Sequence, residues 1–248
     1  MGGTRRILAL LAPLHFVQHQ HRAFAGRLPG GGGRLCSMSA AHANMAQAGS
    51  PPAWARQIDE SLTKNNQAPS DRYVQLATVA EGGEPRVRTV VFRGWASPPL
   101  AGAPHALSFI TDSRSEKMRE SDAAEVCWYL AENREQFRVR GVLSKVGHAE
   151  DDPVLRKLRA DMWQSLSGGA RQSFAWPSPG FPRPPDADNQ ADFQAPEVSA
   201  TEPSEPFTLV YLLPSRVERL TLRGFPQTRT VWERSDPEGE WTQQALNP

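Results

Sequence analysis

Cysteine is scarce in this sequence and long apolar runs are missing, and each absence excludes a class of protein. Only Cys36 and Cys127 occur in 248 residues, too few for a disulfide framework or a structural zinc site. No stretch approaches the roughly 18 consecutive apolar residues of a membrane helix, so we expect no membrane span. A net charge of +1 gives none of the strongly basic character of nucleic-acid-binding domains.

Acidic residues are absent from the first 58 positions, which contain six arginines and no lysine. An Arg-rich, acid-free start is typical of organelle transit peptides, so residues 1–50 are predicted to be an unfolded address for the chloroplast or, alternatively, the mitochondrion. A secretory signal is a second interpretation, because Arg5 and Arg6 precede an apolar run over residues 7–14. An unstructured extension without a targeting function is a third interpretation.

Hydropathy patterns beyond residue 51 predict many short strands and few helices. Helical spacing covers residues 52–64, 115–123 and 153–166, with Asp152 placed to cap the last. The predicted strands cover residues 73–79, 86–94, 107–111, 125–130, 136–147, 207–213, 217–222, 230–233 and 240–244. Such an order favours a mainly β (α+β) fold, a small barrel of antiparallel strands with flanking helices, over residues 51–248.

Proline is concentrated between Pro177 and Pro206, where eight of the 22 prolines lie together with six acidic residues. Arg183 is the only basic residue there. A segment of this composition cannot form a core, so residues 177–206 are predicted to be a loop on the barrel.

Basic and hydroxyl side chains gather around the second and third predicted strands. Arg86 and Arg88 alternate on one strand and should share a face, where two guanidiniums could bind phosphate. A solvated edge strand with scattered charges is the plainer interpretation of that strand alone. Thr111, Ser115 and Lys117 then follow at a strand end, where hydroxyl and ammonium groups could converge on an anion.

Several motifs in order make the chain resemble the pyridoxamine 5′-phosphate oxidase superfamily of FMN-binding split barrels, in a divergent branch related to cyanobacterial and plant oxidase-like proteins. The resemblance covers about Trp54 to Pro248. The motifs are Leu76-Ala77-Thr78-Val79, Arg88-Thr89-Val90-Val91-Phe92-Arg93, Phe109-Ile110-Thr111-Asp112, Asn133-Arg134-Glu135-Gln136-Phe137-Arg138-Val139-Arg140-Gly141, Phe174-Ala175-Trp176 and Gly224-Phe225-Pro226-Gln227.

The resemblance implies an FMN-dependent oxidase that converts phosphorylated B6 vitamers to pyridoxal 5′-phosphate and forms H2O2, with FMN held between the protomers of a homodimer. Glu116 stands where the family usually has Arg, so the charge is assigned to Arg114. Gln136 would reach the flavin from the other subunit. The implied cofactor-binding residues are Arg88, Thr89, Val90, Val91, Thr111, Arg114, Ser115, Lys117, Gln136 and Arg229.

The substrate side departs from the family pattern. Arg93 falls at the family's substrate-phosphate lysine, and Trp163 and Arg171 fall in its substrate pocket. The family's late Arg-x-His pair has no counterpart, since residues 227–230 contain no histidine. The cofactor supplies the redox chemistry, so no catalytic dyad and no metal are expected. An FMN reductase with another substrate and a non-catalytic flavin-binding or B6-binding protein are the alternatives.

Overall fold

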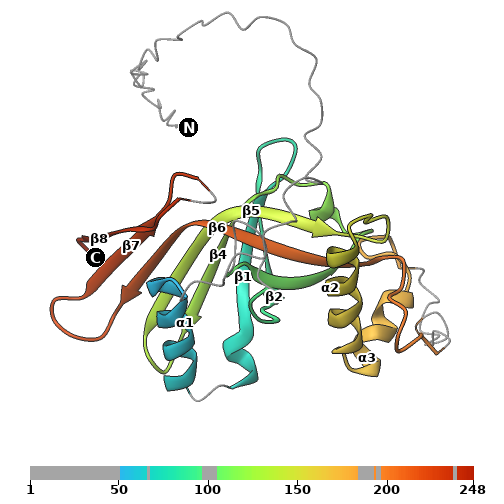
Figure 1. Ribbon diagram of the computed structural model, residues 1–248, viewed down its shortest axis with the longest axis horizontal. Coiled ribbons are helices and arrows are strands. Elements are labelled where there is room, and N and C mark those ends of the chain that lie inside the picture. Colours follow the sequence, from blue (N-terminus) through green and yellow to red (C-terminus); the bar gives the residue numbers. More distant parts are fainter. Residues whose placement is uncertain (1–50, 66–67, 97–104, 184–192, 194–196, 237–238) are drawn as a thin grey trace, which may run out of the picture. The chain divides into compact units, whose positions relative to one another are not determined.

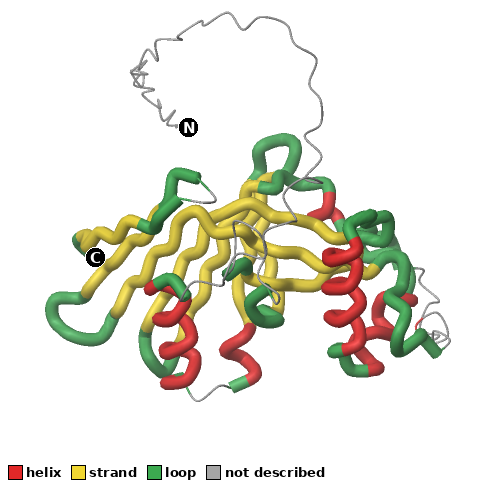
Figure 2. The backbone as a smooth tube through the Cα atoms, viewed as in Figure 1, coloured by secondary structure: helices red, strands yellow, loops and turns green. Residues whose placement is uncertain are grey.

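The computed structural model describes residues 51–248, apart from residues 66–67, 97–104, 184–192, 194–196 and 237–238. The predicted transit peptide over residues 1–50 therefore lies outside the described residues, as does part of the Pro-rich segment. Figure 1 labels the helices and strands, and Figure 2 colours the strands yellow and the helices red. Within the described ranges, no helix has the length and apolar character needed to cross a membrane.

Eight antiparallel strands form one curved sheet. Their bounds are β1 Tyr73–Val79, β2 Pro85–Val91, β3 Leu107–Asp112, β4 Ala123–Leu130, β5 Glu135–Val146, β6 Phe207–Thr221, β7 Thr228–Glu233 and β8 Thr242–Leu246. The order is β2-β1-β4-β5-β6-β7-β8, and β3 pairs separately with β6. Because β3 pairs with the first half of β6, the sheet curls on itself. Within the described residues, β2 and β3 share no ladder, and backbone hydrogen bonds of Arg93 and Gly94 with Ser108 link them just beyond the end of β2. The α+β split-barrel prediction is confirmed.

Three helices flank this sheet. The helix α1, Ala53–Lys64, buries Trp54 and Ile58 against it. The helix α2, Pro153–Gln164, begins as predicted at Asp152, whose side chain accepts hydrogen bonds from the backbone N–H groups of Val154 and Leu155. The short helix α3, Gly168–Gln172, follows it, and the two lie together at one end of the molecule (Figure 1).

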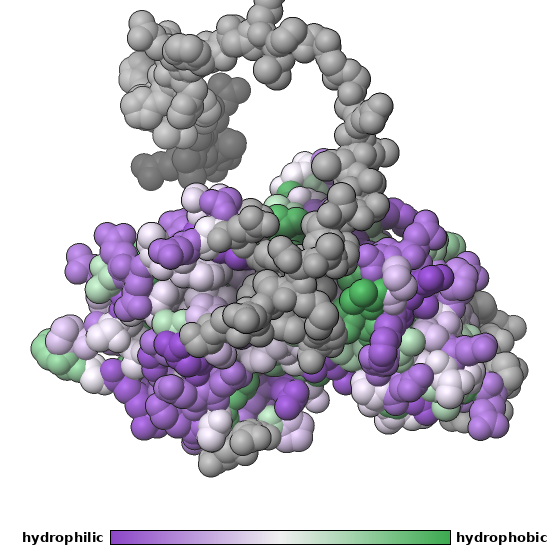
Figure 3. All heavy atoms as spheres, viewed as in Figure 1, coloured by the Kyte–Doolittle hydropathy of each residue, from purple (hydrophilic) through white to green (hydrophobic). Residues whose placement is uncertain are grey.

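Alternating residues of the central strands fill the barrel. Strand β5 alternates buried and partly exposed positions along most of its length. Its inward residues pack with those of β4 and β6 in a core that includes Trp128, Phe137 and Leu212, none of which is exposed to solvent. The surface in Figure 3 is correspondingly hydrophilic over most of the described part, with hydrophobic residues in small areas.

Two predicted boundaries are wrong. Residues 207–213 and 217–222 form one strand, β6, because Pro214 is accommodated at a register shift opposite Arg140 and Gly141. A side chain at Gly141 would place Cβ 2.0 Å from the Leu213 carbonyl oxygen, so only glycine allows this approach. The helix predicted over residues 115–123 is only a 3₁₀ turn at Glu116–Met118, since β4 begins at Ala123.

Candidate functional site

The open edge of β2 borders a cavity of about 280 Å³. Strand β2 pairs only with β1, so some of its backbone N–H and C=O groups have no strand partner on the other side. We call this cavity the phosphate pocket because of the charges on its walls. Its lining residues are Arg88, Thr89, Val90, Val91, Arg93, Ile110, Thr111 and Lys117.

Lys117 and two hydroxyls converge at one end of this pocket. The Lys117 Nζ donates to Thr111 Oγ1 at 3.1 Å and to Ser115 Oγ at 2.9 Å. Ser115 is held in turn by its own bond to the Asp112 carbonyl oxygen, at 2.7 Å. Burial lowers the pKa of Lys117, and the nearby charge of Arg88 lowers it further. An ammonium group in this setting is stabilised by a bound anion.

Arg88 is the second cation of the phosphate pocket, and the protein holds it from behind. Its guanidinium donates to Glu120 Oε2 at 2.6 Å and also contacts the Thr78 hydroxyl. The Glu120 side chain is only 7% exposed, and the Thr78 hydroxyl donates to it as well. This contact fixes the guanidinium. Arg86, in contrast, is exposed and lies near Glu84 at 3.8 Å, so the two arginines of β2 do not form a joint anion site.

Arg114 points away from Lys117. Its guanidinium forms a two-pronged bond with Asp112, at 2.9 and 2.6 Å, and donates to the Phe174 carbonyl oxygen at 3.2 Å. The side-chain bond to Asp112 raises the pKa of Arg114. Arg114 does not line the phosphate pocket. Its assignment to the FMN phosphate stays a prediction, and the structure shows a role in bracing the turn after β3.

Gln136 and Arg229 share the outer face of the sheet. They lie on β5 and β7, on either side of Leu220 of β6. Arg88 projects to the opposite, inner face, because its strand partner Leu76 points into the core alongside Val126. The predicted cofactor residues therefore form two groups on opposite faces of one sheet.

Beside Arg229 lies a set of ion pairs that we call the Glu218 cluster. Glu218 is 8% exposed and accepts hydrogen bonds from Arg138, Arg216 and Arg229. Burial alone would raise the pKa of Glu218, but the hydrogen bonds from the three arginines outweigh it and lower the pKa to about 2. One carboxylate thus fixes three cations on the outer face of β5, β6 and β7.

A second hollow, of about 400 Å³, adjoins the phosphate pocket, with Val91 and Arg93 lining both. We call it the arginine cleft. Arg93, predicted at the substrate, lies where the two hollows meet. The arginine cleft is lined by Arg72, Val91, Phe92, Arg93, Trp95, Ser108, Leu158, Asp161, Met162, Ser165 and Tyr211.

The other two predicted substrate residues lie elsewhere. Trp163 is wholly buried, packs against Phe174 and Phe207, and donates from Nε1 to the Ser199 carbonyl oxygen at 2.9 Å. It is a core residue in this chain. The Arg171 guanidinium donates to the Leu166 carbonyl oxygen at 2.6 Å and lines neither the phosphate pocket nor the arginine cleft.

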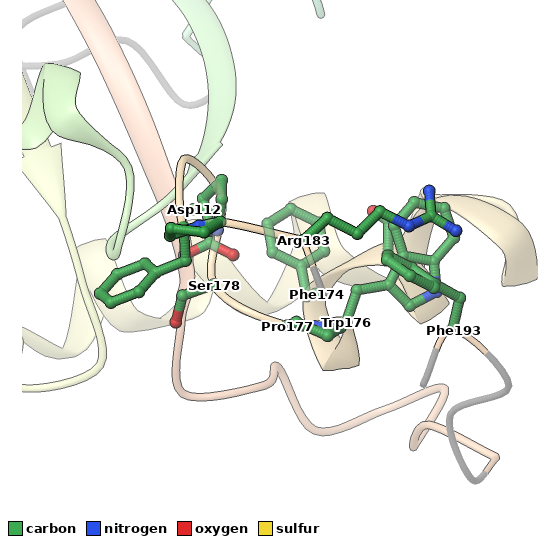
Figure 4. Close-up of a pocket in the computed structure, with 11 residues that line it drawn as sticks. Asp112, Phe174, Trp176, Pro177, Ser178, Arg183 and Phe193 are labelled. Carbon is green, nitrogen blue, oxygen red and sulfur yellow. The ribbon is translucent and has the colours of Figure 1, made fainter. Parts of the chain in front are cut away.

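The start of the Pro-rich segment forms a third hollow, of about 500 Å³. Figure 4 shows Trp176 and Phe193 at one end of it, with the Arg183 side chain extending over them. The Arg183 guanidinium lies 4.9 Å from the centre of the Phe193 ring. Asp112, which braces Arg114, forms part of the wall. This segment therefore packs next to the turn that carries Ser115.

Sequence reasoning missed Thr78, Glu120, Arg72 and Glu218. The first two contact Arg88 from other elements, and Arg72 meets Arg93 only through folding. Glu218 had a weak signal, because Arg216 and Glu218 alternate on a strand that also carries apolar residues. A strand with charges on one face can as easily be solvated, so this pattern alone did not identify a cluster.

The split barrel with cations and hydroxyls at its open edge defines the class of small flavin-binding barrels, and comparison with known proteins supports that class. The family model described as "Pyridoxamine 5′-phosphate oxidase, FMN-binding domain" matches residues 51–147. A solved pyridoxamine 5′-phosphate oxidase-related, FMN-binding protein from Nostoc punctiforme is 38% identical, with a TM-score of 0.74, over 81% of this chain and 100% of that chain.

Two further relatives extend the comparison. Pyridoxine/pyridoxamine 5′-phosphate oxidase 2 of Arabidopsis thaliana is 28% identical over 200 residues, which is 79% of this chain and 96% of that protein. PhzG of Burkholderia lata, solved with tetrahydrophenazine-1-carboxylic acid, is 18% identical with a TM-score of 0.62, over 84% and 98% of the two chains, and supports the fold alone. The chain belongs to the pyridoxamine 5′-phosphate oxidase-like family of FMN-binding proteins.

Proposed function

We propose that the protein is a homodimeric FMN-dependent oxidase that converts pyridoxine or pyridoxamine 5′-phosphate to pyridoxal 5′-phosphate and reduces O2 to H2O2. The observation that carries the proposal is the convergence of Lys117, Thr111 and Ser115 beside Arg88 at the open edge of β2. Arg88, Lys117 and the Thr111 hydroxyl in one pocket, with the Ser115 hydroxyl bonded to Lys117, fit the phosphate of FMN. Family membership supports the same cofactor.

The side chains of the phosphate pocket bind and orient rather than react. Lys117 and Arg88 would neutralise the phosphate, and Glu120 would keep Arg88 in place. Unpaired backbone groups near Val90 and Val91 would meet the edge of the flavin ring. When bound, FMN supplies the two-electron acceptor that the polypeptide lacks. The substrate carbon that bears the alcohol or amine would lose a hydride and its oxygen or nitrogen a proton, and O2 would accept the two electrons with two protons to form H2O2. With the amine, water would hydrolyse the resulting imine to the aldehyde and release ammonia.

The positions of the predicted cofactor residues on two faces of the sheet support a homodimer. Arg88 lies on the inner face of the sheet, whereas Gln136 and Arg229 lie on the outer face. One FMN could not contact both groups within one chain, because the packed sheet separates them. Two chains could, if the outer face of one met the open edge of the other. We therefore propose that each cofactor site takes Arg88 and Lys117 from one protomer and Gln136 and Arg229 from its partner.

The direct test uses the purified chain without residues 1–50, after the bound ligand has been identified by mass and absorption spectrum. We expect a yellow protein that turns pyridoxine 5′-phosphate into pyridoxal 5′-phosphate with equimolar H2O2. A protein that carries FMN but does not turn over either phosphorylated vitamer would refute the oxidase activity and leave the cofactor assignment intact. A protein that cannot bind FMN would refute both.

Mixing variants tests the shared site separately. A chain with Arg88→Ala and Lys117→Ala, and another with Gln136→Ala and Arg229→Ala, should each bind FMN poorly. After the two are dissociated together and reassociated, half the dimers are mixed, and each mixed dimer has one intact site of its two. About a quarter of the wild-type FMN capacity should return. No recovery, despite mixed dimers detected by mass, would contradict the composite site.

We also propose that residues 1–50 direct the domain at residues 51–248 to the chloroplast, with the mitochondrion as the other destination. The support is the acid-free, Arg-rich composition of this segment. A fluorescent protein fused after residue 50 should enter chloroplasts in plant cells, and the same fusion with Arg5, Arg6, Arg22, Arg27 and Arg34 changed to Glu should not. Equal cytosolic fluorescence of both fusions would refute the address.

A further inference from the structure

The arginine cleft contains two guanidiniums that the protein leaves without a counter-charge. Within the described part of the chain, neither Arg72 nor Arg93 makes a side-chain hydrogen bond or ion pair, and the Nε of Arg93 is buried with no partner. Burial is the largest cause that lowers the pKa of Arg93, and the charge of the nearby Arg72 lowers it further. A bound anion would stabilise the charged form of Arg93 beside Arg72.

Backbone hydrogen bonds fix the main chain at both arginines. Arg72 ends a 3₁₀ turn at Pro69–Arg72, and its carbonyl oxygen accepts a hydrogen bond from the Phe92 N–H at 2.8 Å. The Arg93 N–H donates to the Ser108 carbonyl oxygen at 2.9 Å. The two residues therefore come from adjacent ends of β1 and β2. Their proximity is a property of the barrel and not of two flexible loops.

The carboxylate that lines the arginine cleft does not neutralise the pair. Asp161, on α2, is bound by Lys157 at 2.9 and 2.7 Å. Tyr211 also lines the cleft. Burial, and to a lesser extent the charge of Asp161, raises the pKa of Tyr211 to about 12. Its hydroxyl is therefore protonated at neutral pH and can donate a hydrogen bond. The cleft therefore has two cations and a hydroxyl donor available for an anion.

Arg93 falls at the family's substrate-phosphate lysine; we propose that Arg72 is a second guanidinium for the phosphate group of the substrate, and that Arg72 determines the preference for phosphorylated over unphosphorylated ligands. The inference rests on the proposed function, because the arginine cleft meets the phosphate pocket through Val91 and Arg93. A phosphate monoester offers three oxygens, which two guanidiniums can share in bidentate fashion. Arg72 thus takes the place that the sequence assigned to Arg171.

The test measures ligand binding and does not depend on turnover. Inorganic phosphate and pyridoxal 5′-phosphate are titrated by calorimetry into the FMN-loaded protein, so that the phosphate pocket is already filled. Arg72→Ala should weaken both ligands by about 10- to 100-fold, the effect of one charge-assisted hydrogen-bond pair. Unphosphorylated pyridoxal should bind equally to the wild type and the variant. Arg72→Lys should restore part of the affinity, since it keeps the charge and loses the fork.

Two controls separate this inference from its alternatives. Arg156→Ala removes another exposed arginine, on α2 outside the arginine cleft, and should leave both affinities unchanged. Arg171→Ala tests the other assignment, and should also have no effect. Equal binding by the wild type and Arg72→Ala would overturn the inference, as would a wild type that binds neither phosphate nor pyridoxal 5′-phosphate at millimolar concentrations.

Failure of the proposed function remains distinguishable. If the purified chain holds no FMN, the same titration is made in a variant with Arg88→Ala and Lys117→Ala, which removes the neighbouring anion pocket. Phosphate binding that still depends on Arg72 would support the arginine cleft and refute only the flavin site. Phosphate binding that no longer depends on Arg72 would overturn the inference.

Discussion

The Glu218 cluster and the arginine cleft use the same side chain in opposite ways. In the Glu218 cluster, Arg138, Arg216 and Arg229 all bond to one buried carboxylate. In the arginine cleft, Arg72 and Arg93 form no ion pair with any carboxylate among the described residues. The protein therefore supplies the counter-charge in the first region, and a ligand could supply it in the second.

The role of an arginine in this protein is decided by its partners and not by its place in a motif. Arg88, Arg93 and Arg114 all belong to recognisable segments of the family. Arg114 is bound by Asp112, Arg88 is held by Glu120, and the Arg93 side chain has no partner among the described residues. Removing Arg88 or Arg93 should therefore affect ligand binding, whereas removing the carboxylate of the Glu218 cluster should affect stability.

The largest effect is expected at the phosphate pocket. Arg88→Ala with Lys117→Ala removes two charged donors to one anion, and we expect FMN affinity to fall by about 100- to 10,000-fold. Quenching of flavin fluorescence on binding gives the dissociation constant. The matched control is Arg56→Ala with Lys64→Ala, which removes one arginine and one lysine from exposed positions of α1 outside the phosphate pocket. A similar loss in the control would mean that net charge, and not the pocket, governs binding.

Glu218→Gln should break the complete cluster and destabilise the fold. Three guanidiniums would lose their common charge partner, and we expect the free energy of unfolding to fall by about 2 kcal/mol, below the value for a fully buried pair because the arginines are partly exposed. Urea denaturation measures it. Glu125→Gln is the control, since Glu125 pairs with Arg140 at the surface and should cost less than about 0.5 kcal/mol. Equal losses would remove the distinction.

Acid should remove the difference in the free energy of unfolding between the wild type and Glu218→Gln. The pKa of Glu218 is lowered in the folded protein to about 2, so its stabilising effect is present above the unfolded value of about 4.3 and is lost as the pH falls through the folded value. The stability gap between the wild type and Glu218→Gln should stay constant from pH 7 to 5 and close progressively between about pH 4.5 and 2. Urea midpoints at several pH values measure the gap, and a gap independent of pH would contradict the ion pairs.

Arg114→Ala should have the smallest effect on FMN affinity, less than about threefold, because Asp112 already occupies its guanidinium. The same fluorescence titration measures it beside Lys117→Ala. A loss as large as that of Lys117→Ala would show that Arg114 leaves Asp112 to reach the cofactor phosphate, and would restore its predicted role.

Most of the fold could be predicted from the sequence because its signals are local. Alternation marks β5, and Asp152 with Pro153 marks the start of α2. The continuity of β6 could not be predicted, since Pro214 ordinarily interrupts a strand and the opposing Gly141 that accommodates it lies 73 residues away.

The site divides in the same way. Thr111, Ser115 and Lys117 are close in sequence, and the structure brings them together as expected. The resemblance places Trp163 in the substrate pocket by its position in a motif, and a motif does not encode the full burial of its ring between Phe174 and Phe207. Arg72 and Glu120 act through long-range packing, which no local pattern encodes.

Strand β6 fixes how this protein can change over time. Its first half places Tyr211 in the arginine cleft, and its second half places Glu218 in the ion-pair cluster, with the tight contact between Gly141 and Leu213 between them. A single inserted or deleted residue in β6 would move the side chains of one half of the strand to the opposite face of the sheet. Point substitutions at the two regions can therefore accumulate independently, but length changes in this strand cannot, so β6 should be the segment of the barrel whose length its descendants preserve most strictly.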